Sequence, residues 1–501
     1  MSSRSDLPSS HVNRQIAWIG FASTVVSLLD IVAIALIVKF WVSPEQYGTA
    51  TLAISLFPVL DLATDMGLSS AVIQRDDNTP EVVSTVFWLN LAMSVVMFGM
   101  LSGAAPALAR LQGQTVIGTM LLAYGTKLLF QNVYFIPHAM MKRELRFKEL
   151  SVIRIIANLV EFVAKISFAF AGFELWCFVL GPMCRVLTTG IGVQLRHPWR
   201  PRAALKLRAA GDYFKFGVKT SLSQILFQVY TNVDYQVVAY YFGAKANGLY
   251  RLAYELVLEP VRIISDVVAQ VAFPLFARLR TRRAALVEQF IAFTRQNLVV
   301  VIPFLSLVML VGEDLLYLIF GPKWTAAATA ARVLCAVGVF RALSFVVPPL
   351  LDGIGYPGTT LIYTAVASVV LPAAYVGFAW VLGDRFGFLS VAMAWAVGYP
   401  IAFGVLVWLA MRRIGLHGIE YLRRVIGIPL CAFAALAVGA GVRWLVPFAS
   451  VGHAGRLAIV GAATLGVLGV LLAYFQGISP RSIRRSMSDA PPVIEEDKPV
   501  V

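Results

Sequence analysis

The sequence predicts an all-α polytopic membrane protein with about fourteen transmembrane helices. Two observations support this prediction. Of the 501 residues, 59% are hydrophobic and only 14% are charged, whereas soluble domains average about 45–50% apolar and ~25% charged residues. Apolar runs of about 20 residues, the length needed to cross ~30 Å of hydrocarbon, recur along nearly the whole chain. This excess of apolar side chains requires a lipid environment, so we expect one membrane domain.

The apolar runs, with Gly and Pro residues between them, place fourteen spans along the chain. They are expected at 16–38, 49–73, 83–105, 115–137, 150–172, 174–195, 214–241, 249–276, 290–311, 326–350, 359–382, 387–411, 424–446 and 455–476. The expected organisation is an N-terminal cytoplasmic tail over 1–15, one six-helix lobe over 16–212, a second over 213–411, a peripheral helix pair over 412–476 and a disordered cytoplasmic tail over 477–501.

Positively charged residues are distributed unevenly between alternate loops. With the N-terminus inside, the tails and the even-numbered loops hold 25 Lys and Arg residues, and the odd-numbered loops hold 6. Cytoplasmic loops accumulate Lys and Arg in this way, so both termini are expected in the cytoplasm. The net charge of +15 therefore reflects orientation in the membrane and not binding to nucleic acid. The first span is too long for a cleavable signal, so we expect a retained anchor.

A short internal repeat relates the two halves of the chain. Gly48, Leu52 and Ala53 recur 200 residues later as Gly248, Leu252 and Ala253. The repeat pairs the first two spans with the seventh and eighth. Parallel repeats are a common plan among transporters, so we expect two lobes around a central cavity.

Ionisable residues lie inside the expected spans in large number. A charge facing lipid at the bilayer centre costs about 2.5–3.5 kcal/mol, so a dozen would cost on the order of 30 kcal/mol, more than a fold can absorb. We therefore expect them to face the cavity. The candidates for substrate binding are the cations Lys127, Arg154, Lys165, Lys219, Arg251, Arg262 and Arg341. The candidates for ion coupling or ion pairing are Asp30, Asp61, Asp234, Glu255 and Asp266.

Two interpretations of these charges stay open. In the 249–276 span, Arg251, Glu255, Glu259, Arg262 and Asp266 follow one another at steps of three and four residues, and so share one helix face. Such a stripe can line a cavity, or it can be a self-neutralised ladder of ion pairs that locks helices together. Eleven bases against eight acids lie within the spans, which favours an anionic cargo.

Several other functions are disfavoured by what the sequence lacks. There is no G-x-x-x-x-G-K-[ST] loop, which argues against an ATPase. The five histidines are dispersed, and the four cysteines fall within spans without paired spacing, so no metal site, disulfide or cofactor is expected. The expected external loops are all short, whereas a membrane glycosyltransferase or polymerase usually has a larger catalytic loop. The protein is not expected to be an enzyme.

Several segments resemble the polysaccharide transporter family, the Wzx-type oligosaccharide flippases of the MOP exporter superfamily. They appear in the family's order over about residues 15–350. The matching segments are Ser43-Pro-Glu-Gln-Tyr-Gly48, Asp65-Met-Gly-Leu-Ser-Ser-Ala-Val-Ile-Gln-Arg75, Lys142-Arg-Glu-Leu-Arg-Phe-Lys148, Asn232-Val-Asp234, Gly248-Leu-Tyr-Arg-Leu-Ala-Tyr254, Phe273-Pro-Leu-Phe-Ala-Arg278 and Phe320-Gly-Pro-Lys-Trp324.

The resemblance implies flipping of undecaprenyl-diphosphate-linked oligosaccharide across the bacterial inner membrane by alternating access. It places the chain nearer exopolysaccharide exporters than lipid II flippases, which carry arginines in their first two helices where this chain has Asp30, Asp61 and Asp65. It also implies membrane lipid, a polysaccharide polymerase and a chain-length regulator as partners. Two alternatives are a multidrug or cation antiporter of the same superfamily and a membrane glycan polymerase.

Overall fold

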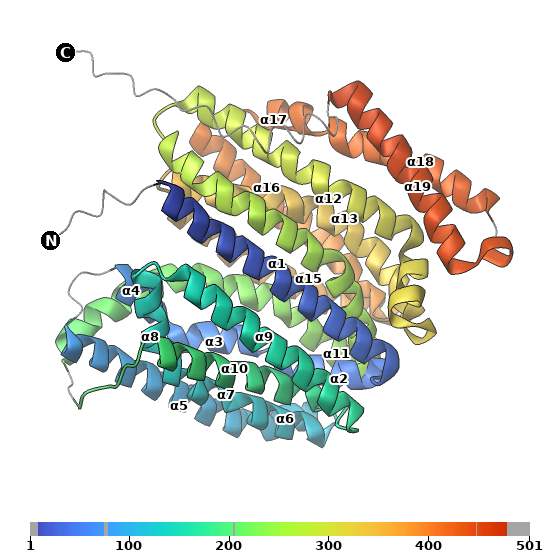
Figure 1. The fold of residues 1–501 in the computed structure, drawn as a ribbon. Helices are drawn as coiled ribbons and strands as arrows, with labels where there is room; N and C mark the ends of the chain where they lie inside the picture. The colour runs from blue at the N-terminus through green and yellow to red at the C-terminus, as the bar shows by residue number, and fades with distance from the viewer. Residues whose placement is uncertain (1–8, 75–78, 204–205, 447, 478–501) are drawn as a thin grey trace, which may run out of the picture.

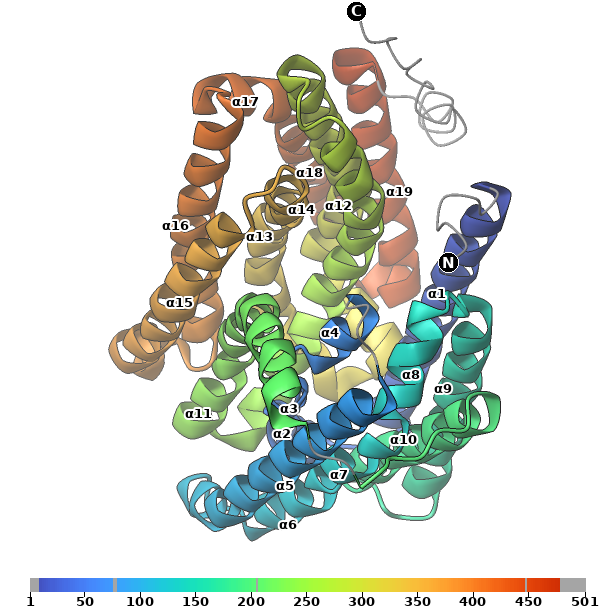
Figure 2. The ribbon, with the colours of Figure 1, turned by 90° about the vertical axis from the view of Figure 1, so that its left-hand side faces the viewer.

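The structure is a computed structural model that describes residues 9–74, 79–203, 206–446 and 448–477. These residues form helices and connecting turns, and no β-strand occurs among them. Figures 1 and 2 show two groups of helices, one above the other. The N-terminal group comprises α1–α10, of which α5, α6, α7 and α10 lie lowest, and the C-terminal group comprises α11–α16, of which α12, α13 and α16 lie above; α1 and α11 run between them.

The N-terminal group contains two broken spans. Its helices are α1 (Ser9–Phe40), α2 (Pro44–Ile54), α3 (Phe57–Asp65), α4 (Leu68–Gln74), α5 (Pro80–Leu111), α6 (Thr115–Gly125), α7 (Lys127–Phe130), α8 (Asn132–Arg143), α9 (Phe147–Phe170) and α10 (Cys177–Arg196). One expected span is divided into α2–α4 and another into α6–α8. Pro58 stands in the first turn of α3, where proline is tolerated, and Met66 ends α3 with a left-handed φ of 44°.

The C-terminal group begins with the longest helix. Its elements are α11 (Leu207–Arg278), α12 (Arg283–Phe320), the 3₁₀ helix η1 (Pro322–Ala327), α13 (Ala328–Phe345), α14 (Val347–Gly353), α15 (Pro357–Phe386) and α16 (Leu389–Ile414). Helix α11 contains two of the expected spans, joined at a kink where Gly243 has φ 81° and ψ 175°. A positive φ with extended ψ is open only to glycine without strain, so Gly243 marks the turn between the two spans.

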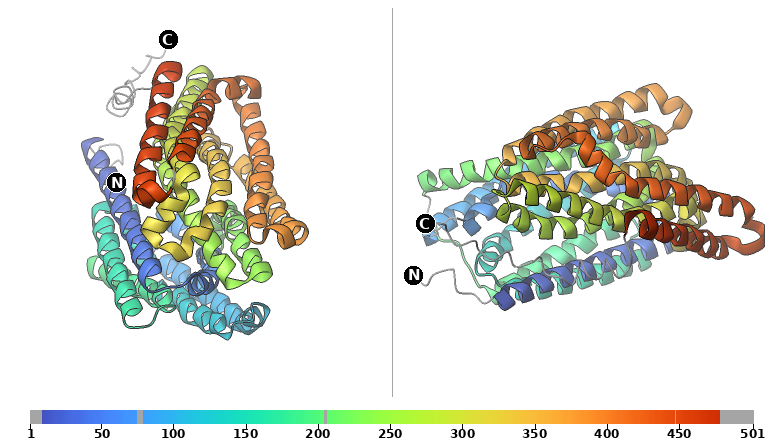
Figure 3. Two further views of the ribbon diagram at one scale, coloured as in Figure 1. Left: turned by 90° about the vertical axis from the view of Figure 1, so that its right-hand side faces the viewer. Right: turned by 90° about the horizontal axis from the view of Figure 1, so that it is seen from above.

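The remaining helices are α17 (Gly418–Val425), α18 (Gly427–Leu445) and α19 (Phe448–Gln476). Figures 1 and 3 show α18 and α19 at the outer edge of the C-terminal group, far from α5 and α6. Among the described residues, ten segments are long and apolar enough to cross a membrane by composition. Helix α9, the two arms of α11 and the broken α6–α8 segment complete the expected set. The all-α polytopic prediction is confirmed, and the lobe boundaries stay a prediction.

The two groups touch where the internal repeat lies. Gly48 on α2 faces Gly248 on α11, and the side chain of Asn247 donates a hydrogen bond to the Gly48 carbonyl at 2.9 Å. A Cβ atom added to Gly48 would lie 1.8 Å from the carbonyl oxygen of Ala244. The two helix backbones are therefore in direct contact, and only glycine at both positions allows it.

The same end of the molecule carries further contacts between the groups. The Trp324 indole donates to the Val38 carbonyl at 3.1 Å, and the Lys323 ammonium donates to the Val42 carbonyl at 2.8 Å. The Trp324 ring also packs edge-on against Tyr47 at 5.7 Å between centroids. The C-terminal end of α1, the start of α2, the kink of α11 and η1 thus form one closed junction.

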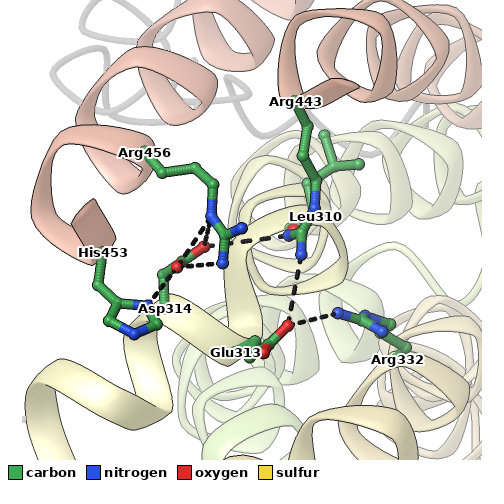
Figure 4. A network of polar contacts seen from close by, with 7 residues as sticks. All are labelled: Leu310, Glu313, Asp314, Arg332, Arg443, His453 and Arg456. Carbon is green, nitrogen blue, oxygen red and sulfur yellow. Dashed lines mark hydrogen bonds and ion pairs between the residues drawn. The ribbon is translucent and has the colours of Figure 1, made fainter. Parts of the chain in front are cut away.

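An ionic network attaches α18 and α19 to α12 (Figure 4). Its centre is Asp314, which is 0% exposed and accepts hydrogen bonds from Arg456 at 2.6–3.0 Å and from His453 at 2.7 Å. Helix α12 is irregular at Val311, and Arg443 donates to the neighbouring Leu310 carbonyl. A charged side chain satisfies a backbone group beside the irregularity, so the helix break and the docking of α18 depend on each other.

Candidate functional site

A cationic pocket lies within the N-terminal group, between α1, α8, α9 and α10. Its volume is about 550 Å³. Its lining includes three cationic side chains, Lys142, Arg154 and Arg185, and one carboxylate, Asp30. The polar lining consists of Asp30, His138, Lys142, Ser151, Arg154, Asn158, Arg185 and Thr189.

Helix α9 positions Arg154 at this pocket. At the start of α9, Arg146 donates two hydrogen bonds to Glu149, at 2.8 and 2.7 Å, which lower the pKa of that carboxyl. Two turns into the helix, the Arg154 guanidinium donates to the hydroxyl of Ser23 on α1 at 3.1 Å. The Asn158 amide donates to the Arg154 carbonyl at 2.8 Å. The contact with Ser23 orients the Arg154 side chain toward α1 and leaves most of its donors for a ligand.

The pocket has more positive charge than its own carboxylates neutralise. Among the described residues, neither Arg154 nor Lys142 has a carboxylate oxygen within 4.0 Å, whereas Arg185 pairs with Glu161 at 3.0 Å. Fixed cations without counter-ions bind anions well, because charge-assisted hydrogen bonds are roughly twice as strong as neutral ones. The geometry therefore suits a phosphate or carboxylate ligand.

Beside the pocket, the other predicted charges of the N-terminal group are paired. Glu161, 2% exposed, bridges Lys165 at 2.7 Å and Arg185 at 3.0 Å. Lys127 pairs with Asp61 at 2.5 Å, which joins α7 to α3. Removing one member of such a buried pair leaves an uncompensated charge, so these residues hold the helices around the pocket in place.

The charged residues along one face of α11 form a ladder of ion pairs, which is one of the two interpretations of the sequence pattern. Arg251 pairs with Glu255 at 2.7 Å, and Arg262 pairs with Glu259 at 2.8 Å and with Asp266 at 2.9 Å. The ladder also reaches the N-terminal group, because the Tyr47 hydroxyl donates to Glu255. Arg251 and Glu255 therefore belong to the junction between the groups as well as to the ladder.

Two further predicted charges are buried among aromatic rings in the C-terminal group. Asp234 is 0% exposed and accepts hydrogen bonds from the Tyr250 hydroxyl at 2.7 Å and the Trp395 indole at 2.9 Å. Arg341 is 2% exposed, donates to the Tyr254 hydroxyl at 2.6 Å, and lies 5.4 Å from the centroid of the same Trp395 ring. Neither charge has an oppositely charged partner within 4.0 Å among the described residues, so neutral donors and π faces replace ion pairs.

The structure thus divides the predicted residues into three sets. Arg154 and Asp30 line the open pocket, and Lys127, Asp61 and Lys165 lie in ion pairs beside it. The ladder holds Arg251, Glu255, Arg262 and Asp266, and the aromatic cluster holds Asp234 and Arg341. The side chain of Lys219 lies outside the described residues.

The sequence-based set leaves out two cations of the pocket. Arg185 lies inside the expected span 174–195, and Lys142 lies between the expected spans 115–137 and 150–172. Helix α8 continues to Arg143, so Lys142 stands one turn beyond His138 and faces the same pocket. Between Pro137 and Lys142 the sequence has no Gly and no further Pro that would end the helix, and this was the available signal.

Comparison with protein-family models shows which family the chain belongs to. Residues 41–329, more than half of the chain, match the family described as "Polysaccharide biosynthesis protein". The chain belongs to this family. It is 30% identical to the teichuronic acid biosynthesis protein TuaB of Bacillus subtilis, over 56% of the chain and 59% of TuaB. It is 23% identical to the succinoglycan biosynthesis transport protein ExoT of Rhizobium meliloti, over 77% of the chain and 76% of ExoT.

Solved structures share the fold. The lipid II flippase MurJ, in an inward closed conformation, superposes with a TM-score of 0.71 at 14% identity, over 92% of this chain and 99% of MurJ. An inward-facing multidrug resistance MATE transporter of the MOP superfamily superposes with a TM-score of 0.61 at 18% identity, over 78% of this chain and 94% of that chain. The chain therefore shares the all-α polytopic fold of these two structures.

Proposed function

We propose that this family member is a flippase that moves undecaprenyl-diphosphate-linked oligosaccharide repeat units across the bacterial inner membrane by alternating access. The observation that carries the proposal is the cationic pocket, in which Arg154 and Lys142 lack carboxylate partners among the described residues. A diphosphate lipid is an anion that must lose water inside the protein, so it requires fixed cations and hydrogen-bond donors.

The charges favour an anionic cargo over a cationic drug. Three cations face one carboxylate in the pocket, whereas the predicted acids of the C-terminal group are bonded to arginines on α11 (Glu255 and Asp266) or to aromatic donors (Asp234). A drug antiporter would need free carboxylates toward its cavity. Polysaccharide assembly is also the process named for the family and for TuaB and ExoT.

The closed junction supports a cytoplasm-facing state. By the loop-charge rule, the end that carries Gly48, Gly248 and Trp324 faces the periplasm. The pocket lies nearer the opposite end, since Ser23 and Arg154 stand in the first turns of their spans. We infer that the lipid-linked unit enters from the cytoplasmic leaflet and leaves after the junction opens. Of the two predicted charges in the aromatic cluster, Asp234 is the candidate to bind a coupling ion, and Arg341 is the candidate to contact an acidic sugar.

From the loop charges we also propose that both termini lie in the cytoplasm, and that the protein is a transporter and not an enzyme. The flipped unit would be consumed on the other leaflet by a polysaccharide polymerase with its chain-length regulator.

Deleting the gene in the native bacterium tests this function. We expect lipid-linked repeat units to accumulate in the membrane while surface polysaccharide is lost, and the wild-type gene should restore both. Normal surface polysaccharide in the deletion strain would contradict the proposal. Loss of polysaccharide with repeat units already exposed to the periplasm would indicate a polymerase instead.

A further inference from the structure

We propose that α17 and the arginines around it form an in-plane anchor that binds anionic phospholipid headgroups of the cytoplasmic leaflet. Helix α17 connects α16, which ends at Ile414, to α18, which begins at Gly427. Both neighbours are apolar segments long enough to span the membrane. Because α17 follows one span by a few residues and precedes the next directly, it has to lie at the membrane surface.

One face of α17 is fixed on the protein. Tyr421 and Val425 are buried, and the Tyr421 ring stacks on Phe290 of α12 at 5.5 Å with 19° between the planes. Arg424 pairs with Glu288 of α12 at 2.5 Å. These contacts set the rotation of α17 about its own axis, so its opposite face has a defined direction.

The opposite face is apolar and uncovered. Ile419 is 81% exposed, and Leu422 is 56% exposed. Ile426 follows Leu422 by four residues at the helix end, and Arg423 stands beside them on the same arc. A short amphipathic helix with large apolar residues and arginine at the surface is typical of helices that lie in the headgroup region.

Arginines surround this apolar face. Among the described residues, Arg412, Arg413 and Arg423 have no carboxylate oxygen within 4.0 Å and are exposed. Arg283 donates to the carbonyls of Ile414 and Gly415 at 2.7 and 2.6 Å, which brings the arginine-rich turn 278–283 beside α17. Exposed cations next to an apolar face complement an anionic lipid surface better than a neutral protein surface.

The test compares phosphatidylglycerol with phosphatidylcholine binding to the purified full-length protein. Replacing Arg412, Arg413 and Arg423 with Gln should reduce the preference for phosphatidylglycerol at least about tenfold, since each juxtamembrane arginine contributes about fivefold. The matched control is Arg110→Gln, a single exposed arginine at the end of α5, which should reduce the preference by no more than about fivefold. An unchanged preference in the triple variant would overturn the proposal.

A second measurement does not depend on charge. An environment-sensitive fluorophore on Ile419→Cys, in a variant without the four native cysteines, should be quenched by headgroup-labelled lipids in phosphatidylglycerol nanodiscs. Because Ile419 is exposed, the substitution leaves the packing of α17 intact. A fluorophore that stays in water in these nanodiscs, or that is shielded only when another protein is added, would refute lipid anchoring.

Discussion

Enlarging Gly48 by a single methyl group should open the junction between the two helix groups. The added Cβ would lie 1.8 Å from the Ala244 carbonyl oxygen and 2.7 Å from the Gly248 backbone nitrogen. Both obstacles are backbone atoms, so no side chain can turn aside. Overpacking of this kind costs about 1–3 kcal/mol, which shifts the ratio of closed to open states by about 5- to 150-fold. Gly248→Ala, which meets the Pro44 carbonyl oxygen at 1.8 Å, should behave alike.

The assay measures access to the pocket from outside the cell. A cysteine at Thr189, which lines the pocket, is labelled in spheroplasts with a membrane-impermeant thiol reagent, in a background without native cysteines. We expect labelling in Gly48→Ala to be at least about fivefold faster than with Gly48 intact. The control is Gly99→Ala on α5, where the added Cβ has nothing within 4 Å. Equal labelling in both variants, with normal export, would refute the role of the glycine pair.

Three further predictions test separate parts of the structure. Asp314→Asn should lower the melting temperature of the purified protein, because Arg456 loses a buried charged partner at a cost of about 3–5 kcal/mol. An unchanged melting temperature would contradict the docking role of the network. Glu161→Gln should also lower the melting temperature, because Lys165 loses its charged partner. The double variant Glu161→Gln with Lys165→Met should recover part of that loss, and no recovery would argue against a charge effect. Alkaline phosphatase fused after Gly243 should be active and after Arg143 silent, and the opposite pattern would invert the topology.

The fold could be predicted because it is encoded in local pattern. Fourteen apolar runs of membrane length leave few arrangements for a chain with this composition. The division of two spans into α2–α4 and α6–α8 was not predicted. Pro58 marks one break, but the left-handed turn at Met66 depends on packing that has no local signature.

The candidate site could be predicted only in part. Arg154 was found because a charge inside an apolar span must have a polar environment. Which charges pair with each other depends on helix rotation and distance in space, and neither can be derived from spacing. Asp314 and Arg456, 142 residues apart, were therefore missed as partners, whereas the α11 ladder, whose members are three and four residues apart, was one of the two interpretations left open by the spacing.

The most direct test of the central claim is the initial rate at which a labelled undecaprenyl-diphosphate-linked oligosaccharide crosses the bilayer of proteoliposomes, followed with a membrane-impermeant lectin. The wild-type protein should accelerate crossing over protein-free liposomes. Arg154→Gln should slow it by about 10- to 150-fold, the equivalent of one charged hydrogen bond of about 1.5–3 kcal/mol, while Arg110→Gln should not. Equal rates for the Arg154→Gln variant and the wild type, or for the wild type and empty liposomes, would contradict the account.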